Sequence, residues 1–215
     1  MRVDFSESNS AIYEKIKREL SDLPGERAHM EMSPLRGRSS EELKKAQSFK
    51  VSAVLALIYQ QDGQLFSLLT ERQTYKGKHS GQMSFPGGKM EDFDKNPGET
   101  ALRETQEEVG IAPHKIELLG QLTDVYIPVS QFLVHPFLGY TATRPITKKE
   151  EREVQSIIHF PLEELLDNNN RIETRIKMDN GMILKDVPAF QIQNKIVWGA
   201  TALMLNELKE ILNRI

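Results

Sequence analysis

The order of hydrophobic and polar residues predicts an amphipathic helix near each end of the chain. Near the N-terminus an apolar stripe at helical spacing runs up to Pro24-Gly25, which ends the helix. Its members are Ile12, Tyr13, Ile16 and Leu20. Near the C-terminus a longer stripe predicts a final helix that packs on a core, with Trp198 as its anchor. Its members are Trp198, Thr201, Ala202, Leu205, Leu208 and Leu212.

Between these helices, apolar runs separated by turn residues predict strands. Lys50 to Tyr59 is a strongly apolar strand, and Asp62-Gly63 predicts the hairpin that joins it to a partner at residues 64–70. Asn180-Gly181 predicts a second hairpin. Further strands are expected at residues 83–85, 116–124, 132–140, 154–160, 172–178 and 183–190, with short helices at 39–46 and 161–166. This mixture of strands and helices favours an α+β fold.

A further helix is predicted from Gly98 to Val109, directly behind a Phe-Pro-Gly-Gly turn, and Gly110 is a natural stop for it. Glu104 and Glu108 lie four residues apart and Glu107 lies three from Glu104, so three carboxylates share one face. Like charges stacked in this way weaken an isolated helix, so the arrangement persists most easily when a cation neutralises it. Ligands that are all oxygen atoms favour Mg²⁺ or Mn²⁺.

The same segment resembles the Nudix box, GX5EX7REUXEEXGU, in which U is aliphatic. Every fixed position from Arg103 to Ile111 matches, with Thr105 at a position that is usually aliphatic. Gly88 and Arg103 are 15 positions apart where the family pattern has 14, so one residue is inserted in the loop before the helix. The upstream acid of the pattern is therefore either Asp94, six residues after Gly88, or Glu91.

A second resemblance extends toward the N-terminus. Residues 68–72, LLTER, and residues 81–88, GQMSFPGG, are similar to the signature of the coenzyme A pyrophosphatase branch of the Nudix family. Two positions depart from that signature. Gly77 stands where an arginine is expected, with Lys76 and Lys78 on either side, and Gln73 stands where a small residue is expected.

The resemblance implies a Nudix-type α/β/α sandwich with a mixed central sheet at residues 49–215, preceded by an N-terminal helical extension at residues 1–48. It also implies a hydrolase in which water attacks one phosphorus of a pyrophosphate while divalent cations neutralise the charge. Glu104 and Glu108 are expected to bind the metal directly, because carboxylates four residues apart point the same way. Glu107 is expected to be a further ligand or to support one.

Three more residues of this segment have expected roles at the metal. Arg103 is expected to pair with a loop carboxylate such as Glu91 and to orient the acidic cluster. Gly87 and Gly88 let the backbone approach the metal or a phosphate, and the Gly88 carbonyl is an expected metal ligand. A glutamate of the helix is the first choice for the base that takes a proton from water, and a residue of a later loop is the second.

The substrate is expected to be coenzyme A or an acyl derivative, cleaved to 3′,5′-ADP and a 4′-phosphopantetheine product. Arg72, Lys76, Lys78 and His79 form a cationic loop suited to a polyanionic substrate, although any one of them is equally consistent with an ordinary surface charge. Two alternatives remain open. One is a Nudix pyrophosphatase for ADP-ribose, nucleotide sugars or other nucleoside diphosphate derivatives, and the other is a nucleotide-sensing domain without turnover.

Composition narrows the remaining classes of function. The chain has 28 basic and 31 acidic residues, a net charge of −3, which argues against a general nucleic-acid or membrane-surface binder. Zero cysteines exclude disulfides and thiolate metal sites. No apolar run approaches the ~20 residues of a membrane span, and a cytoplasmic location is expected. The first helix either caps the core or joins a homodimer, and the sequence does not separate these two roles.

Overall fold

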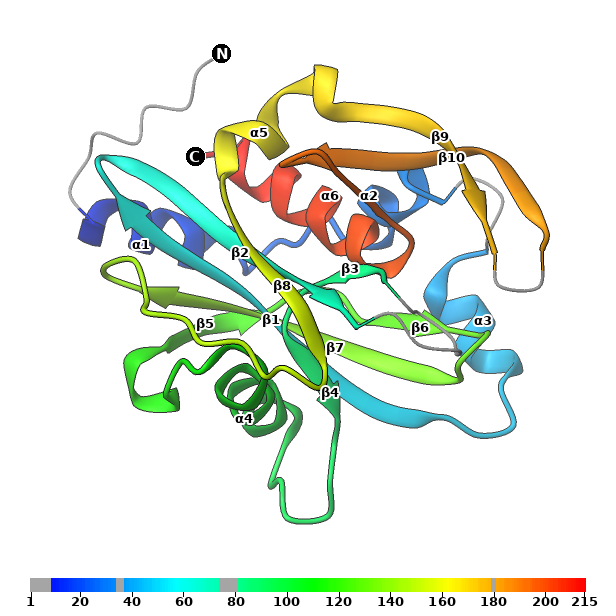
Figure 1. The fold of residues 1–215 in the computed structure, drawn as a ribbon, viewed down its shortest axis with the longest axis horizontal. Coiled ribbons are helices and arrows are strands. Elements are labelled where there is room, and N and C mark those ends of the chain that lie inside the picture. Colours follow the sequence, from blue (N-terminus) through cyan, green and yellow to red (C-terminus); the bar gives the residue numbers. More distant parts are fainter. Residues whose placement is uncertain (1–8, 34–36, 74–80, 179–180) are drawn as a thin grey trace.

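The computed structural model describes residues 9–33, 37–73, 81–178 and 181–215 and is built around one mixed β-sheet (Figure 1). β1 (Lys50–Gln61) lies at its centre, with β2 (Gln64–Arg72) antiparallel on one side and β7 (Phe132–Thr141) parallel on the other. The remaining strands pair antiparallel with these three: β3 (Met83–Ser84) and β8 (Val154–Pro161) with β2, β4 (Gly87–Lys89) with β1, and β5 (Glu117–Gln121) and β6 (Val125–Ile127) with β7.

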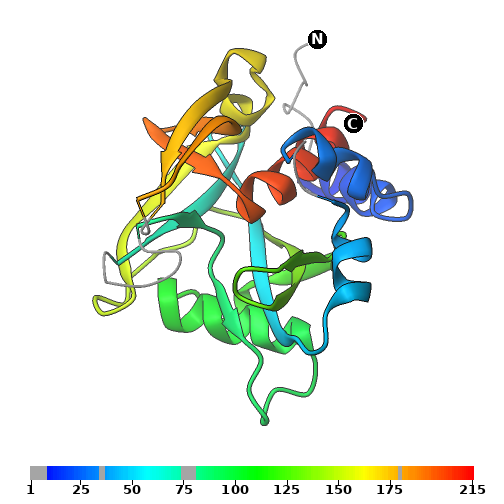
Figure 2. The same cartoon turned by 90° about the vertical axis from the view of Figure 1, so that its right-hand side faces the viewer.

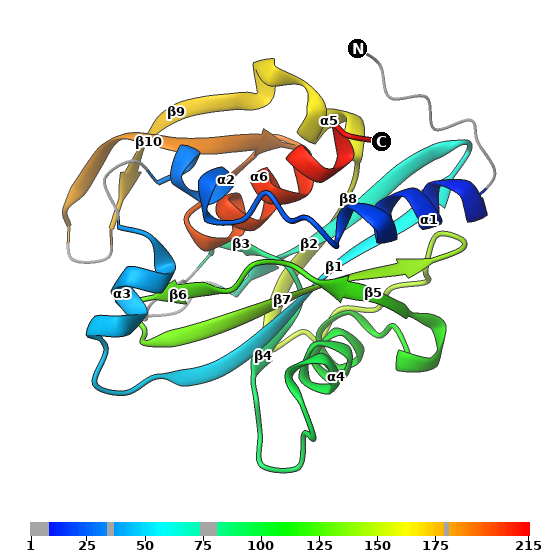
Figure 3. The same cartoon turned by 180° about the vertical axis from the view of Figure 1, so that it is seen from behind.

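β1 is apolar along most of its length because both of its faces are buried. Leu55 belongs to the hydrophobic cluster beneath α4 (Pro97–Val109), whereas the next residue, Ala56, belongs to the cluster beneath α6 (Ala200–Leu212). The two helices therefore cover opposite faces of the sheet, as Figures 1 and 3 show. The predicted α+β class, with a mixed central sheet between helices, is confirmed.

The carboxylate-bearing helix α4 has both of its ends fixed by local chemistry. The Asn96 side chain caps the first turn by accepting a hydrogen bond from the backbone N–H of Glu99. Gly110 ends the helix in the left-handed conformation, with φ of 77°. Within the helix, the buried Thr105 hydroxyl donates to the Ala101 carbonyl, so a threonine is tolerated at a position that is usually aliphatic.

The N-terminal part forms three helices, α1 (Asn9–Glu19), α2 (Glu26–Glu31) and α3 (Ser39–Lys45), of which α2 was not predicted. Ile16 of α1 is fully buried in the same cluster as α6. α2 is tied to α6 by the buried Glu207 carboxylate, which accepts hydrogen bonds from Gly25 and Thr123 and contacts the His29 ring at 3.1 Å. Residues that precede β1 therefore share one hydrophobic core with the sheet and with α6. The division into residues 1–48 and 49–215 stays a prediction.

A smaller antiparallel sheet packs beside α6, on the side away from the N-terminal helices (Figure 2). It contains β9 (Arg171–Lys177), β10 (Ile183–Ile192) and β11 (Lys195–Trp198), and it follows the short helix α5 (Leu162–Leu166). Trp198 ends β11 and does not belong to the final helix as predicted, since Gly199 separates the two elements. β6 lies between the strands expected at residues 116–124 and 132–140 and was not predicted. No helix in the described residues is long and apolar enough to cross a membrane.

Candidate active site

Two glycines allow β4 to lie directly between β1 and α4. A Cβ on Gly87 would come within 2.3 Å of the Ala53 carbonyl oxygen and 2.6 Å of the Val54 Cα atom, both parts of a buried backbone that cannot move aside. A Cβ on Gly88 would meet the Glu104 carboxylate at 2.5 Å. Gly87 is therefore needed for packing, and Gly88 for the close approach of a carboxylate to the main chain.

Glu108 is buried, with 4% of its surface exposed, and its carboxylate faces the same turn. The backbone N–H of Gly87 donates to its Oε2 atom at 3.3 Å. Burial raises the pKa of Glu108 to about 8, the Arg72 guanidinium and the Gly87 hydrogen bond oppose this rise, and the neighbouring carboxylates of Glu104 and Glu153 add to it. The pKa of Glu104 is also raised, again mainly by burial. The positive groups and hydrogen-bond donors around Glu104 and Glu108 therefore only partly balance the negative charge of the two carboxylates.

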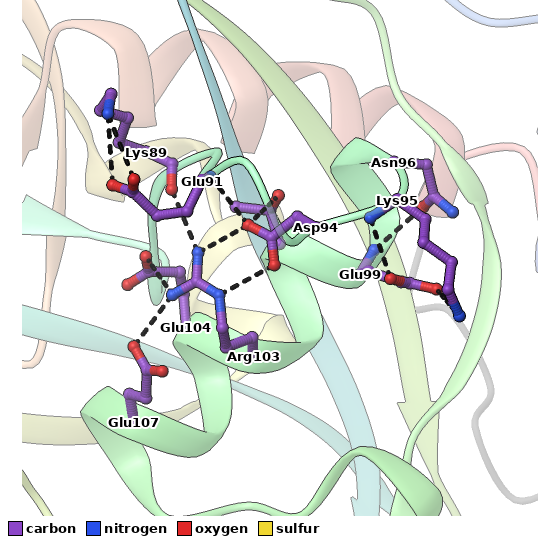
Figure 4. Close-up of polar contacts among 10 residues, drawn as sticks. Lys89, Glu91, Asp94, Lys95, Asn96, Glu99, Arg103, Glu104 and Glu107 are labelled. Atoms are coloured by element: carbon purple, nitrogen blue, oxygen red, sulfur yellow. Dashed lines mark hydrogen bonds and ion pairs between the residues drawn. The ribbon is translucent and has the colours of Figure 1, made fainter.

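Arg103 is the centre of the polar contacts around these carboxylates (Figure 4). Its Nε and Nη2 atoms donate to the two oxygens of Asp94 at 3.0 and 2.8 Å. Its Nη1 atom donates to Glu104 at 2.7 Å and to Glu107 at 2.9 Å. The guanidinium thus holds two carboxylates of the helix at fixed distances from the loop before it.

The loop partner of Arg103 is Asp94, so the expectation that Glu91 fills this role is wrong. Asp94 is buried and also accepts hydrogen bonds from the Glu91 backbone N–H and the Thr100 hydroxyl. These contacts, with the Arg103 pair first among them, lower the pKa of Asp94 to about 2. The Glu91 side chain instead pairs with Lys89 on the outside of the loop. The residue inserted between Gly88 and Arg103 therefore does not prevent the loop acid from pairing with Arg103.

The segments that form this site lie within the part of the chain that matches a known family. A model of the NUDIX domain matches residues 49–179. The chain belongs to the Nudix family. It is similar to the uncharacterized Nudix hydrolase NudL of Pectobacterium atrosepticum, with 35% identity over 66% of this chain and 72% of that protein. It is also similar to the human mitochondrial coenzyme A diphosphatase NUDT8, with 34% identity over 65% of this chain and 58% of that protein.

The fold comparison agrees with the family. The Nudix hydrolase RenU of M. smegmatis superimposes with a TM-score of 0.54, 16% identity, and coverage of 77% of this chain and 87% of that one. At this identity the likeness concerns the fold alone. Together with the family match and the hydrolase relatives, it identifies the chain as a Nudix hydrolase.

The predicted Nudix ligands differ in their surroundings. Glu104 and Glu108 both lie against the Gly-Gly turn, whereas the Glu107 side chain is 57% exposed and contacts Arg103. Among the residues that the structure describes, no three acidic or histidine side chains converge as a ready metal-binding group. The pair of Glu104 and Glu108 still fits a divalent cation, because it offers oxygen donors side by side and its negative charge is only partly balanced.

The predicted phosphate-binding residues are placed only in part. Arg72 ends β2 close enough to Glu108 to lower its pKa, and the Arg72 Nε atom is buried with no hydrogen-bond partner among the described residues. An unpartnered guanidinium donor beside buried carboxylates is suited to a phosphate oxygen that also contacts a cation. Lys76, Lys78 and His79 lie outside the described residues, so the cationic loop as a whole is not placed.

One acidic neighbour of the site was missed from the sequence. Glu153 precedes β8 and acts on both Glu104 and Glu108, yet it is 45 positions after Glu108 and belongs to no motif. It reaches the site because β8 pairs with β2. The loop acid Asp94 did have a signal, its spacing of six residues from Gly88.

Proposed function

We propose that this Nudix hydrolase cleaves the pyrophosphate bond of coenzyme A or acyl-coenzyme A, giving 3′,5′-ADP and (acyl-)4′-phosphopantetheine, with Mg²⁺ or Mn²⁺. The observation that carries the proposal is the pairing of the two signature segments at the site. Thr70 pairs with Ser84 and Glu71 with Met83, and the Arg72 N–H donates to the Gln82 carbonyl at 3.0 Å. The LLTER and GQMSFPGG segments therefore form one wall beside Glu104 and Glu108.

The NUDT8 relationship supports the same substrate, since that relative is named a coenzyme A diphosphatase. In the proposed reaction, water attacks one phosphorus, the bond from that phosphorus to the bridging oxygen breaks, and a helix glutamate accepts a proton from the water. Glu104 and Glu108 would hold the divalent cation, which supplies charge neutralisation and activates the water. Arg72 donates to a phosphate oxygen, and Arg103 holds Glu104 in place.

Product analysis by mass spectrometry tests this proposal most directly. The purified protein with Mg²⁺ is given coenzyme A, acyl-coenzyme A, ADP-ribose, a nucleotide sugar and a dinucleotide. We expect 3′,5′-ADP from coenzyme A, with a higher kcat/KM than for the other compounds. Preference for ADP-ribose or a nucleotide sugar would overturn the substrate and leave the pyrophosphatase activity standing. Binding of the compounds without turnover of any would instead indicate a nucleotide-sensing domain.

Matched variants assign the activity to the carboxylate helix. Glu104→Gln removes a partly buried charge beside Gly88 and should nearly abolish turnover, whereas Glu163→Gln changes an exposed acid of α5 and should not. Equal activity of the two variants would contradict the assignment of the site.

Recognition of the 3′-phosphate is tested separately at the cationic loop. Charge reversal at Lys76 and Lys78 should raise KM for coenzyme A much more than for dephospho-coenzyme A, with kcat mostly unchanged, because contacts made equally to substrate and transition state alter KM. Equal changes for the two compounds would refute recognition of the 3′-phosphate by this loop.

A further inference from the structure

β9 is an edge strand of the smaller antiparallel sheet. The strand order in this sheet is β11-β10-β9, so β9 pairs with β10 on one side, and no strand of the described residues pairs with its other side. β9 lies at the margin of the molecule in Figures 1 and 3. A free edge of this kind exposes backbone N–H and C=O groups that can pair with a strand of another chain.

The backbone groups that point to the free edge can be identified from the pairing with β10. The Met178 N–H donates to the Met182 carbonyl at 2.8 Å. Backbone direction alternates along a strand, so Thr174, four residues before Met178, also turns its N–H and C=O toward β10. The odd-numbered residues, such as Glu173, turn theirs to the free edge. The register agrees with this assignment, because Glu173 faces Pro188, which has no N–H to donate.

The side chains of β9 divide into a charged face and a less polar face. The more exposed face carries charges of both signs, from Arg171, Glu173, Arg175 and Lys177. The half-buried face carries Ile172, Thr174 and Ile176. Arg171 pairs with Glu31 at 3.0 Å, whereas Glu173 and Arg175 have no ion-pair partner in the described part of the chain. Two opposite charges are therefore available at the free edge, two residues apart.

We propose that the β9 edge binds the β9 edge of a second copy of this chain, antiparallel about a two-fold axis at Thr174. Glu173 of each copy then lies opposite Arg175 of the other, and the outward-facing backbone groups of these two residues exchange hydrogen bonds. Ile172 lies opposite Ile176 of the second copy, which pairs apolar side chains on the other face. Both copies use the same strand, as a two-fold symmetric interface requires, and the two three-stranded sheets become one.

The charges select this register among those that the backbone permits. Moving one copy by two residues in one direction would place Glu173 opposite Glu173, and in the other direction Arg175 opposite Arg175. Like charges directly opposite each other destabilise a strand pair. In the proposed register the end pair is Lys177 opposite Arg171, and Glu31 already balances the charge of Arg171. β9 carries none of the residues assigned to the candidate active site, so this inference goes beyond the proposed function.

Charge reversal tests the inference, with the dimer measured by sedimentation equilibrium over a range of protein concentrations. The parent should dimerise, and Glu173→Arg or Arg175→Glu alone should each raise the dimer Kd about tenfold or more, because each variant places like charges opposite each other twice. An equimolar mixture of the two variants should dimerise again, since each then faces the opposite charge. The control Lys185→Glu reverses an exposed charge of β10 and should change the Kd less than about twofold.

A cysteine at the two-fold axis tests the register. The chain contains no cysteine, so Thr174→Cys introduces a single thiol. Residues opposite each other in an antiparallel pair without hydrogen bonds have Cα atoms about 4.5 Å apart, a separation that a disulfide can span. Under mild oxidation Thr174→Cys should form a covalent dimer, whereas the control Ile172→Cys should not, because Ile172 faces Ile176 of the second copy.

Three results would overturn the inference. One is a parent that stays monomeric at every concentration, since the charges of β9 would then protect a free edge from pairing. Another is a dimer whose Kd is the same in the parent and in both charge variants, which would place the interface elsewhere. The last is equal crosslinking of Thr174→Cys and Ile172→Cys, which would exclude an axis at Thr174. Circular dichroism of each variant checks that it is folded, and the mixture of charge variants provides a gain of association that misfolding cannot produce.

Discussion

Ionised Glu108 should destabilise the metal-free protein, and Glu108→Gln should remove this effect. The folded-state pKa of about 8 lies above the ordinary value of 4.5, so the folded protein binds more protons than the unfolded chain between these two pH values. The stability present below pH 4.5 is therefore lost as pH rises through 8. The Gln side chain stays neutral at every pH, and its amide oxygen can accept the same N–H bond from Gly87.

The size of the effect follows from the difference in pKa. One pKa unit corresponds to ~1.4 kcal/mol, so the raised pKa of Glu108 makes the folded protein about 3.5 kcal/mol less stable at pH 8 than at pH 5. For a chain of this length, 1 kcal/mol changes Tm by about 2–4 °C. The Tm of metal-free Glu108→Gln minus that of the parent should therefore be about 7–14 °C larger at pH 8 than at pH 5.

The assay is thermal unfolding of both proteins from pH 5 to pH 8 in the presence of a chelator. Burial also lowers the pKa of His159 and raises that of Glu104. Both residues are present in parent and variant, so the difference between the two pH profiles reports the loss of the Glu108 carboxylate together with its coupling to Glu104. Mg²⁺ or Mn²⁺ should raise the Tm of the parent at pH 8 and should have little effect on the variant. Parallel pH profiles of the two proteins would refute the reasoning.

Three further predictions concern the residues that support the site. Gly88→Ala should fold but lose most activity, because the new Cβ displaces the movable Glu104 carboxylate. Gly87→Ala should instead lower Tm strongly, because its Cβ collides with the backbone of β1. Activity assays and melting curves of both variants check these two expectations. Asp94→Asn removes the paired charge of Arg103 and should reduce kcat more than it changes KM, and unchanged kinetics would contradict the positioning role. Glu207→Gln weakens the hydrogen bonds from Thr123 and Gly25 at a fully buried site and should cost about 2–3 kcal/mol in chemical denaturation without changing KM.

Much of the fold could be predicted because its signals are local. The apolar run of β1 and the Asp62-Gly63 turn predict a hairpin that is present, and α4 ends at the predicted Gly110. The elements that were missed are short and owe their form to tertiary contacts. α2 is six residues long and is fixed by Glu207 from the other end of the chain, and β6 exists because Val125 pairs with Val134 of β7. Neither leaves a periodic pattern that a sequence window could detect.

The same distinction explains the candidate site. Spacing along one helix places Glu104 and Glu108 on one face, so this pair could be predicted. The sequence offered Asp94 and Glu91 for the upstream acid of the pattern, and Asp94 is the one that pairs with Arg103. The choice between Asp94 and Glu91 depends on which carboxylate the Thr100 hydroxyl and a backbone N–H can reach, a property of the folded loop. Glu153 depends on the register between β2 and β8 and on hydrogen bonds to the end of α4. A sequence motif therefore predicts the site residues that lie on one element, whereas the structure is needed to find those that strand pairing brings to the site from elsewhere in the chain.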